Sequence, residues 1–229
     1  MTSSLVLSQV PGFDPLTVPV VGEEEPLRAL QAHEYCAASI LQKFQAAQPF
    51  SVQPHFVSNP QTAKREAAVL VGLVLRHEVT LLLTQRAAHL KTHSGQVAFP
   101  GGKIDPQDTS VEAAALREAH EEVGLEVHHV QVVGRLPVLE TGTAFRITPV
   151  VALIDPLHEI NFNANEVAHV FEVPMSFLMD PSNHRKHRLE HQGQTREWYS
   201  MPYKVDGQEH FIWGATASMI RNFYAFLSA

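Results

Sequence analysis

The sequence predicts an α/β fold in which helices cover both faces of a mixed β-sheet. Three observations support this prediction. Two apolar runs, at residues 67–75 and 79–84, are joined by a short polar turn, which is typical of a β-hairpin. An alanine-rich segment at about 109–123 has the composition of a helix. Apolar runs at 130–139 and 147–154 follow it as further strands, so strands lie on both sides of the helix in the sequence.

The first part of the chain is expected to form an extension to this fold. Apolar residues recur at helical spacing between residues 27 and 44, which predicts one amphipathic helix. Residues 48–60 contain three prolines and are typical of a connector. The chain is therefore expected to divide into an N-terminal extension, 1–60, and a main domain, 61–229.

The last part of the chain contains a long polar stretch between apolar segments. Residues 166–179 predict a short strand followed by a short helix, and 214–227 predict a final helix. The stretch 181–200 is polar and rich in histidine, and no strand or helix is assigned to it. Its candidate zinc ligands lie among arginine and lysine side chains, which repel a cation, so a zinc site is not expected. These ligands are His184, His187 and His191.

Charge and composition limit the partners of the protein. Lysine and arginine number 17 against 24 aspartates and glutamates, a net charge of −7, so the basic footprint of a nucleic-acid-binding protein is missing. The longest apolar run is too short to cross a bilayer, and no signal-peptide pattern is evident. A single cysteine, Cys36, excludes an internal disulfide. We therefore expect a cytoplasmic protein with no nucleic-acid or membrane partner, which acts on a small-molecule substrate and has a homodimer as its candidate assembly.

The alanine-rich segment has recognisable helix ends. Thr109 and Glu112 form a capping-box pattern, which predicts the start, and Gly124 is placed to end the helix. At about 100° per residue, one face is apolar and is expected to pack on the sheet. That face consists of Leu116, Ala119 and Val123.

Three glutamates share the other side of this helix. Glu118, Glu121 and Glu122 have i, i+3 and i+4 spacing, which crowds three carboxylates that repel one another unless a cation neutralises them. Hard divalent cations such as Mg²⁺ and Mn²⁺ prefer carboxylate oxygens, and a bound cation can bridge to phosphate. The simpler interpretation of such spacing is a solvated acidic face. Arg117 before the glutamates, Gly124 after them and the glycines upstream favour the metal site.

These residues resemble the box of the Nudix hydrolases, G-x5-E-x7-R-E-U-x-E-E-x-G-U with U an aliphatic residue. The second half of the box matches at Arg117, Glu118, Ala119, Glu121, Glu122, Gly124 and Leu125. The first half departs, because the acidic position counted from Gly102 is Asp108, and eight residues rather than seven separate it from the arginine. The departure leaves the role of Asp108 open.

The resemblance implies a fold and a set of roles. It implies a Nudix-type α/β/α sandwich that binds Mg²⁺ or Mn²⁺ and hydrolyses a diphosphate. Glu118 and Glu122 would be metal ligands, Glu121 a ligand or the water-activating base, and Arg117 the residue that orients a glutamate. Glu166, in a downstream segment, is the alternative base. Position on the helix favours Glu121.

The segment before the box resembles the signature of coenzyme A diphosphatases, L-L-T-x-R-[SA]-x3-R-x3-G-x3-F-P-G-G. It matches at Leu82, Leu83, Thr84, Arg86, Ala87, Gly95, Phe99, Pro100, Gly101 and Gly102, with Lys91 in place of an arginine. Coenzyme A carries a diphosphate and a separate 3′-phosphate, so cations and glycine backbone N–H groups suit it. The expected substrate-binding residues are Arg86, Lys91, His93, Gly95, Gly101, Gly102 and Lys103.

The resemblance therefore implies hydrolysis of coenzyme A, and of its acyl forms, to 3′,5′-ADP and 4′-phosphopantetheine. Two alternatives stay open at this point. The first is a Nudix enzyme for another diphosphate, such as ADP-ribose, NADH or a dinucleoside polyphosphate. The second is a Nudix-like nucleotide sensor without turnover, which the three retained glutamates and Arg117 disfavour.

Overall fold

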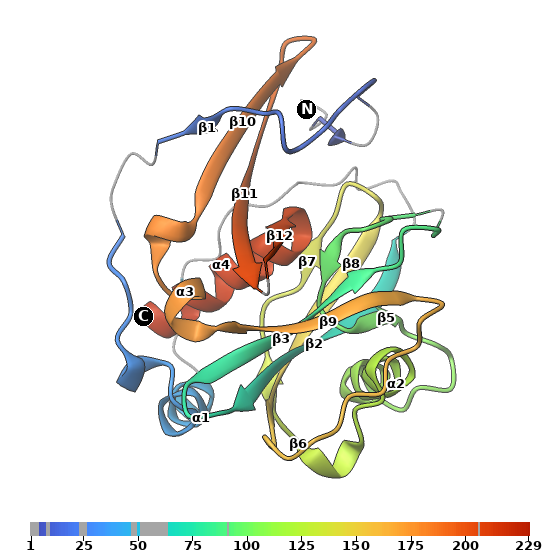
Figure 1. The fold of residues 1–229 in the computed structure, drawn as a ribbon, viewed down its shortest axis with the longest axis vertical. Coiled ribbons are helices and arrows are strands. Elements are labelled where there is room, and N and C mark those ends of the chain that lie inside the picture. The colour runs from blue at the N-terminus through green and yellow to red at the C-terminus, as the bar shows by residue number, and fades with distance from the viewer. Residues whose placement is uncertain are drawn as a thin grey trace.

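Two β-sheets and the helices packed against them make up the protein (Figure 1). The computed structural model describes residues 5–7, 10–22, 27–46, 50, 64–90, 92–205 and 207–229. The expected division at residue 60 lies within 51–63, outside the described residues. Among the described residues, no helix is both long enough and apolar enough to cross a bilayer.

The larger sheet contains eight strands and is mixed, as the sequence predicts. The long central strands β2 and β8 run parallel, and β3 pairs with β2 in the antiparallel sense to complete the predicted hairpin. The expected strand at 130–139 divides into β6 and β7. The strands are β2 (Arg65–Leu75), β3 (Val79–Arg86), β4 (Val97–Ala98), β5 (Gly101–Lys103), β6 (Val130–Arg135), β7 (Leu139–Glu140), β8 (Phe145–Ile154) and β9 (Val167–Pro174).

Helices cover both faces of this sheet, which confirms the predicted α/β/α sandwich. Alternate residues of β2 point to opposite faces, so Leu70 belongs to the core under α2 and Leu73 to the core on the other side. Of the helices among the described residues, α2 (Val111–Val123) is the one that packs on the first face. The second core is larger and includes residues of α1 (Ala37–Ala46), α3 (Met175–Leu178) and α4 (Gly214–Ser228).

A second, four-stranded sheet includes most of the polar stretch 181–200, to which no element was assigned, and extends beyond it. Its strands, in order, are β1 (Val20–Val21), β10 (Arg185–His191), β11 (Gln194–Val205) and β12 (Gln208–Trp213). The histidines there have structural contacts. His187 is buried, stacks on Trp198 and hydrogen-bonds Ser200 at 2.8 Å. The Nε2 atom of His184 lies 2.8 Å from the Leu178 carbonyl oxygen.

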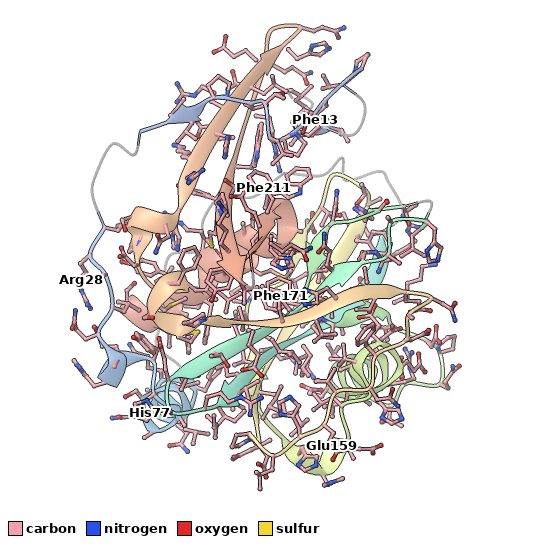
Figure 2. The ribbon with its side chains drawn as sticks, viewed as in Figure 1. Phe13, Arg28, His77, Glu159, Phe171 and Phe211 are labelled. Atoms are coloured by element: carbon pink, nitrogen blue, oxygen red, sulfur yellow. The ribbon has the colours of Figure 1, made fainter. Side chains whose placement is uncertain are left out.

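The N-terminal segment lies across the second sheet and then along the side of the molecule (Figure 1). The Phe13 ring, labelled in Figure 2, packs edge-on against Trp198 with ring centroids 5.7 Å apart. The helix expected over 27–44 is wrong in its first part, because the chain forms only the turn η2 (Ala32–Glu34) before α1. The Glu34 carboxylate accepts hydrogen bonds from Arg28 and from the Gln31 N–H, and these contacts stabilise the turn. The remaining short turns are η3 (Val127–His129) and η4 (Pro181–Asn183).

Candidate active site at the glutamate helix

The N-terminal end of α2 differs from the sequence prediction, and its C-terminal end agrees with it. The residue that caps the N-terminus is Ser110, whose hydroxyl accepts the Ala113 N–H at 3.1 Å. The predicted capping box is therefore wrong, because Glu112 turns away to bind Arg135, at 2.7 Å from Nη2. Gly124 ends the helix as predicted, with φ of 72°. This left-handed conformation favours glycine and closes the last turn.

Glu122 is buried, which corrects the expectation that all three glutamates face away from the core. Ala119 and Val123 are fully buried as predicted, and Leu116 only partly. Glu122 lies beside them with 4% of its surface exposed. Its Oε2 accepts the Gly101 N–H at 3.1 Å, and its Oε1 lies 3.7 Å from Arg86 Nη1.

The electrostatics of the glutamates show that they share one site. Burial raises the pKa of Glu122 to about 7, against the opposing effects of the Gly101 N–H and Arg86, and the charges of Glu118 and Glu166 raise it further. Burial also raises the pKa of Glu118, while Arg117 lowers it and Glu121 and Glu166 raise it. The site therefore contains mutually repelling carboxylates, three from the helix and one, Glu166, from a segment that is distant in the sequence.

Arg117 connects the carboxylates through its guanidinium group. Its Nη1 donates to Glu118 at 2.9 Å and to Glu121 at 3.1 Å. Its other two nitrogens donate to Asp108, Nε at 3.0 Å and Nη2 at 2.9 Å. The extra residue between Asp108 and Arg117 does not separate them, because the chain before α2 forms a turn in which the Asp105 N–H donates to Asp108 Oδ2 at 2.8 Å.

Two adjacent glycines let β5 approach the helix closely. A Cβ atom on Gly102 would lie 2.4 Å from the carboxyl carbon of Glu118. Gly101 has φ of 155°, and a Cβ atom there would lie 2.5 Å from the Ala68 carbonyl oxygen. Any side chain at either position would displace Glu118 or the pairing of β5 with β2. The Gly101 N–H group, expected to contact phosphate, donates to Glu122 in this structure.

Within the predicted substrate segment 82–102, residues 87–96 connect β3 to β4 and form the candidate substrate loop, which begins where β3 ends at Arg86. The Nε atom of Arg86 is buried and has no hydrogen-bond partner among the described residues, so this cation has a donor available for an anion. The Lys103 side chain is exposed beside the helix. His93 and Gly95 lie farther out, at exposed positive-φ positions with φ of 55° and 69°. Lys91 lies outside the described residues.

The segment that carries Glu166 is fastened between the helix and the loop. The Asn163 N–H donates to the Glu122 carbonyl at 2.9 Å, and the Glu166 N–H donates to the Asn163 carbonyl at 2.9 Å. The Ala87 N–H then donates to the Glu166 carbonyl at 2.9 Å. Sequence reasoning missed the role of Asn163, although three asparagines within residues 161–165 favour turns of this kind.

The glutamate cluster has the chemistry of a site for a hard divalent cation. Among the described residues, no three histidine, cysteine, aspartate or glutamate side chains stand close enough to hold a metal ion. The reason is local, because Glu118 and Glu121 each face Arg117 and Glu122 faces Gly101. The donors nevertheless fit Mg²⁺ or Mn²⁺, which prefer carboxylate oxygens. A cation would neutralise Glu118 and Glu122, whose pKa values are raised by burial and, to a lesser extent, by neighbouring carboxylates.

Comparison with known proteins places this site in a family. The chain is similar to a solved Ap4A hydrolase of C. elegans, with 21% identity and a TM-score of 0.42 over 50% of this chain and 81% of that one. Nudix hydrolase NudL of Enterobacter sp. strain 638 is 40% identical over 193 residues, which cover 84% of this chain and 95% of NudL. NudL of Photorhabdus laumondii is 44% identical over 156 residues, or 68% and 81% of the two chains. Residues 63–202 match the NUDIX domain. The chain therefore belongs to the Nudix family of hydrolases, which act on phosphoric anhydride bonds.

Proposed function

We propose that this protein hydrolyses the diphosphate bond of coenzyme A and of its acyl forms, releasing 3′,5′-ADP and 4′-phosphopantetheine. One observation carries the proposal. The signature segment at residues 82–102 resembles that of coenzyme A diphosphatases, and its arginine, Arg86, lies 3.7 Å from Glu122 of the glutamate helix. The segment that suggests the substrate and the helix that suggests the chemistry thus belong to one site.

The carboxylates divide into metal ligands and a base in this proposal. Glu118 and Glu122 hold the cation, with Glu121 as a further candidate ligand. A bound Mg²⁺ or Mn²⁺ supplies positive charge against the oxygens of the diphosphate and lowers the pKa of water. Arg117 keeps the Glu118 carboxylate in place through the 2.9 Å hydrogen bond. Glu121 and Glu166 are the two candidates for accepting the proton of the attacking water.

The cations of the loop bind the substrate in this proposal. Arg86, whose buried Nε has no hydrogen-bond partner in the described part of the chain, is suited to a diphosphate oxygen beside the carboxylates. Lys103 flanks the same site. His93 and Gly95 belong to the exposed outer part of the loop, and we assign the 3′-phosphate of coenzyme A to this part and to Lys91.

A substrate panel with product analysis by mass spectrometry tests the proposal. We expect the full chain with Mg²⁺ or Mn²⁺ to convert coenzyme A to 3′,5′-ADP and 4′-phosphopantetheine, with a higher kcat/KM than for ADP-ribose, NADH or a dinucleoside polyphosphate. Excess chelator should abolish turnover. A higher kcat/KM for one of the other diphosphates would contradict the coenzyme A assignment but not the family.

The 3′-phosphate contact is tested with Lys91→Ala. We expect a higher KM for coenzyme A with little change in kcat, because the contact is made in the ground state and the transition state alike. The KM for dephospho-coenzyme A, which lacks the 3′-phosphate, should rise less. Lys43→Ala on α1 is the matched control and should leave KM and kcat unchanged for both substrates. Equal losses on both substrates would place Lys91 at the diphosphate instead.

A further inference from the structure

The second sheet contacts the substrate loop through two glutamine side chains. Gln85, the last residue but one of β3, donates from Nε2 to the Gly95 carbonyl at 3.2 Å. Gln208, the first residue of β12, donates from its own Nε2 to Gln85 Oε1 at 3.2 Å. A carbonyl oxygen can only accept, so the Gln85 amide must present its nitrogen to Gly95 and its oxygen to Gln208. The two glutamines therefore form a directional chain of hydrogen bonds from β12 to the loop.

The end of the loop is held by α4. The hydroxyl of Thr216, in the first turn of α4, donates to the Val97 carbonyl at 2.9 Å. Both residues are buried, with 6% and 4% of their surfaces exposed, so the hydrogen bond is sheltered from water. Within the loop base, the Arg86 N–H donates to the Gln96 carbonyl at 3.0 Å. Both ends of residues 87–96 are thus fixed.

A stack of rings keeps β12 in place over the large sheet. The His210 ring of β12 lies 3.9 Å from the Phe171 ring and 5.1 Å from the His169 ring of β9, nearly parallel to both. Figure 2 shows Phe171 on β9 below β12. His210 is fully buried, and neither ring nitrogen has a hydrogen-bond partner among the described residues, so packing alone holds it. β9 pairs with β3 at Gln85, so the stack stabilises β12 directly beside the glutamine chain.

We propose that Gln85, Gln208 and Thr216 are positioning residues that fix the substrate loop. The second sheet thereby sets the affinity for substrates that contact this loop. Gln208 and Thr216 lie beyond residues 63–202 that match the NUDIX domain. These residues act through the loop backbone and not through the carboxylates. Their loss should therefore weaken binding of the outer part of the substrate and leave the chemical step intact. The affinity part of the proposal rests on the proposed function, whereas the loop-positioning part does not.

Hydrogen–deuterium exchange on the full chain tests the positioning directly, without any substrate. Gln85→Ala and Gln208→Ala should each speed exchange of peptides that span residues 86–96, while peptides from α2 stay unchanged. Gln194→Ala, at the far end of the same sheet, is the control and should leave the loop peptides as in the wild type. Unchanged loop exchange in both test variants would overturn the proposal, whatever the substrate proves to be.

Thr216 offers a matched pair for kinetics. Thr216→Val keeps the shape but removes the donor to Val97, and Thr216→Ser keeps the donor. For coenzyme A we expect Thr216→Val to raise KM roughly three- to tenfold with kcat within about twofold, and Thr216→Ser to stay near wild type. A fall in kcat with unchanged KM, or equal effects of the two variants, would overturn the affinity role. If the wild type does not cleave coenzyme A, the proposed function fails, and the exchange experiment still decides on the positioning.

Discussion

Asp108 accepts two hydrogen bonds from Arg117, Nε to Oδ1 at 3.0 Å and Nη2 to Oδ2 at 2.9 Å. This planar pair leaves Nη1 for Glu118 and Glu121, at 2.9 and 3.1 Å. The pKa of Asp108 is lowered, first by the Arg117 hydrogen bonds and then by the Asp105 N–H. Asp108 therefore stays ionised and orients the arginine, although it lies one residue out of the usual register.

The Asp108–Arg117 pair should matter for turnover more than for binding. We expect Asp108→Ala to lower kcat by about tenfold or more, on the scale of lost outer-shell support for a metal ligand. KM should change little. Asp105→Ala is the control, since the Asp105 carboxylate lies 3.9 Å from Arg117 and is half exposed. Steady-state kinetics at saturating Mg²⁺ distinguish the two, and equal effects of both variants would remove the special role of Asp108.

The Glu122 carboxylate should lower the stability of the metal-free protein and yet be required for turnover. Between pH 4.5 and about 7 the unfolded chain loses the Glu122 proton while the folded chain keeps it, so stability falls as pH rises through this range. At pH 8 the ionised, buried carboxylate costs at most about 3 kcal/mol in metal-free protein. We expect Glu122→Gln to raise the metal-free Tm at pH 8 and to lower kcat by roughly 100-fold or more. A variant that retains wild-type kcat would refute the metal assignment.

Glu118→Gln should lower kcat on the same scale and keep the fold. Burial raises the pKa of Glu118, and the charges of Glu121 and Glu166 raise it further against the opposing effect of Arg117. Removal of the Glu118 charge therefore removes a partly buried charge and its repulsion in metal-free protein. Added Mg²⁺ should raise the Tm of the wild type, since a ligand that binds only the folded state stabilises it. This increase should shrink in Glu118→Gln. If Mg²⁺ raised the Tm of Glu118→Gln as much as that of the wild type, the cation would bind at another site.

The two candidate bases differ in their surroundings. Glu121 is 55% exposed and binds Arg117 at 3.1 Å, whereas Glu166 faces Glu118 and Glu122 closely enough to raise the pKa of both. These surroundings favour Glu166 as the base, so Glu166→Gln should remove the acidic limb of the pH–kcat profile and Glu121→Gln should keep it. The reverse result would make Glu121 the base, the choice that helix position favours.

His184 should make stability depend on pH below neutrality. Burial lowers the pKa of its imidazole from 6.5 to about 4, and Arg221 donates to Nδ1 at 3.1 Å, so the folded protein resists protonation. Both states are neutral above pH 6.5. Between 6.5 and about 4 only the unfolded state gains the proton, so stability falls with falling pH, by up to about 1.4 kcal/mol per unit.

Denaturant unfolding at several pH values tests the His184 effect. His184→Gln should be less stable at pH 7, yet its stability should fall less between pH 6.5 and pH 5. His77→Gln, in the exposed turn between β2 and β3 and labelled in Figure 2, is the control and should keep the wild-type slope. An unchanged slope in the His184 variant would assign the acid sensitivity to other groups.

The sequence predicted those elements whose signals are local. The hairpin β2–β3, the helix α2 with its Gly124 end, β8 and α4 follow from apolar runs and from glycine. The burial of Glu122 could not be read from spacing alone. It depends on Gly101, which offers its N–H from a strand 21 residues away in the sequence. Helical periodicity places a side chain on a face but does not reveal which neighbour covers it.

The second sheet was missed because its stability is not local. His187 is a polar residue in the sequence, yet it is buried by stacking on Trp198 and by a hydrogen bond to the Val18 carbonyl, 169 residues away. The first half of the expected 27–44 helix failed for a related reason. The Arg28–Glu34 ion pair favours a tight turn over a continuing helix, and its geometry appears only in three dimensions.

The pairing of β1 with β10 has a consequence for self-association. A strand at the edge of a sheet presents unpaired N–H and carbonyl groups, which can recruit the same strand from another molecule. Val20 and Val21 pair with His187 and Lys186 and so occupy part of that edge from within the same chain. A shortened protein that began at residue 63, where the family match begins, would keep its glutamate helix but expose this edge. Deletion of the N-terminal segment should therefore promote self-association through β10, although Val20 and Val21 lie outside the residues that match the NUDIX domain.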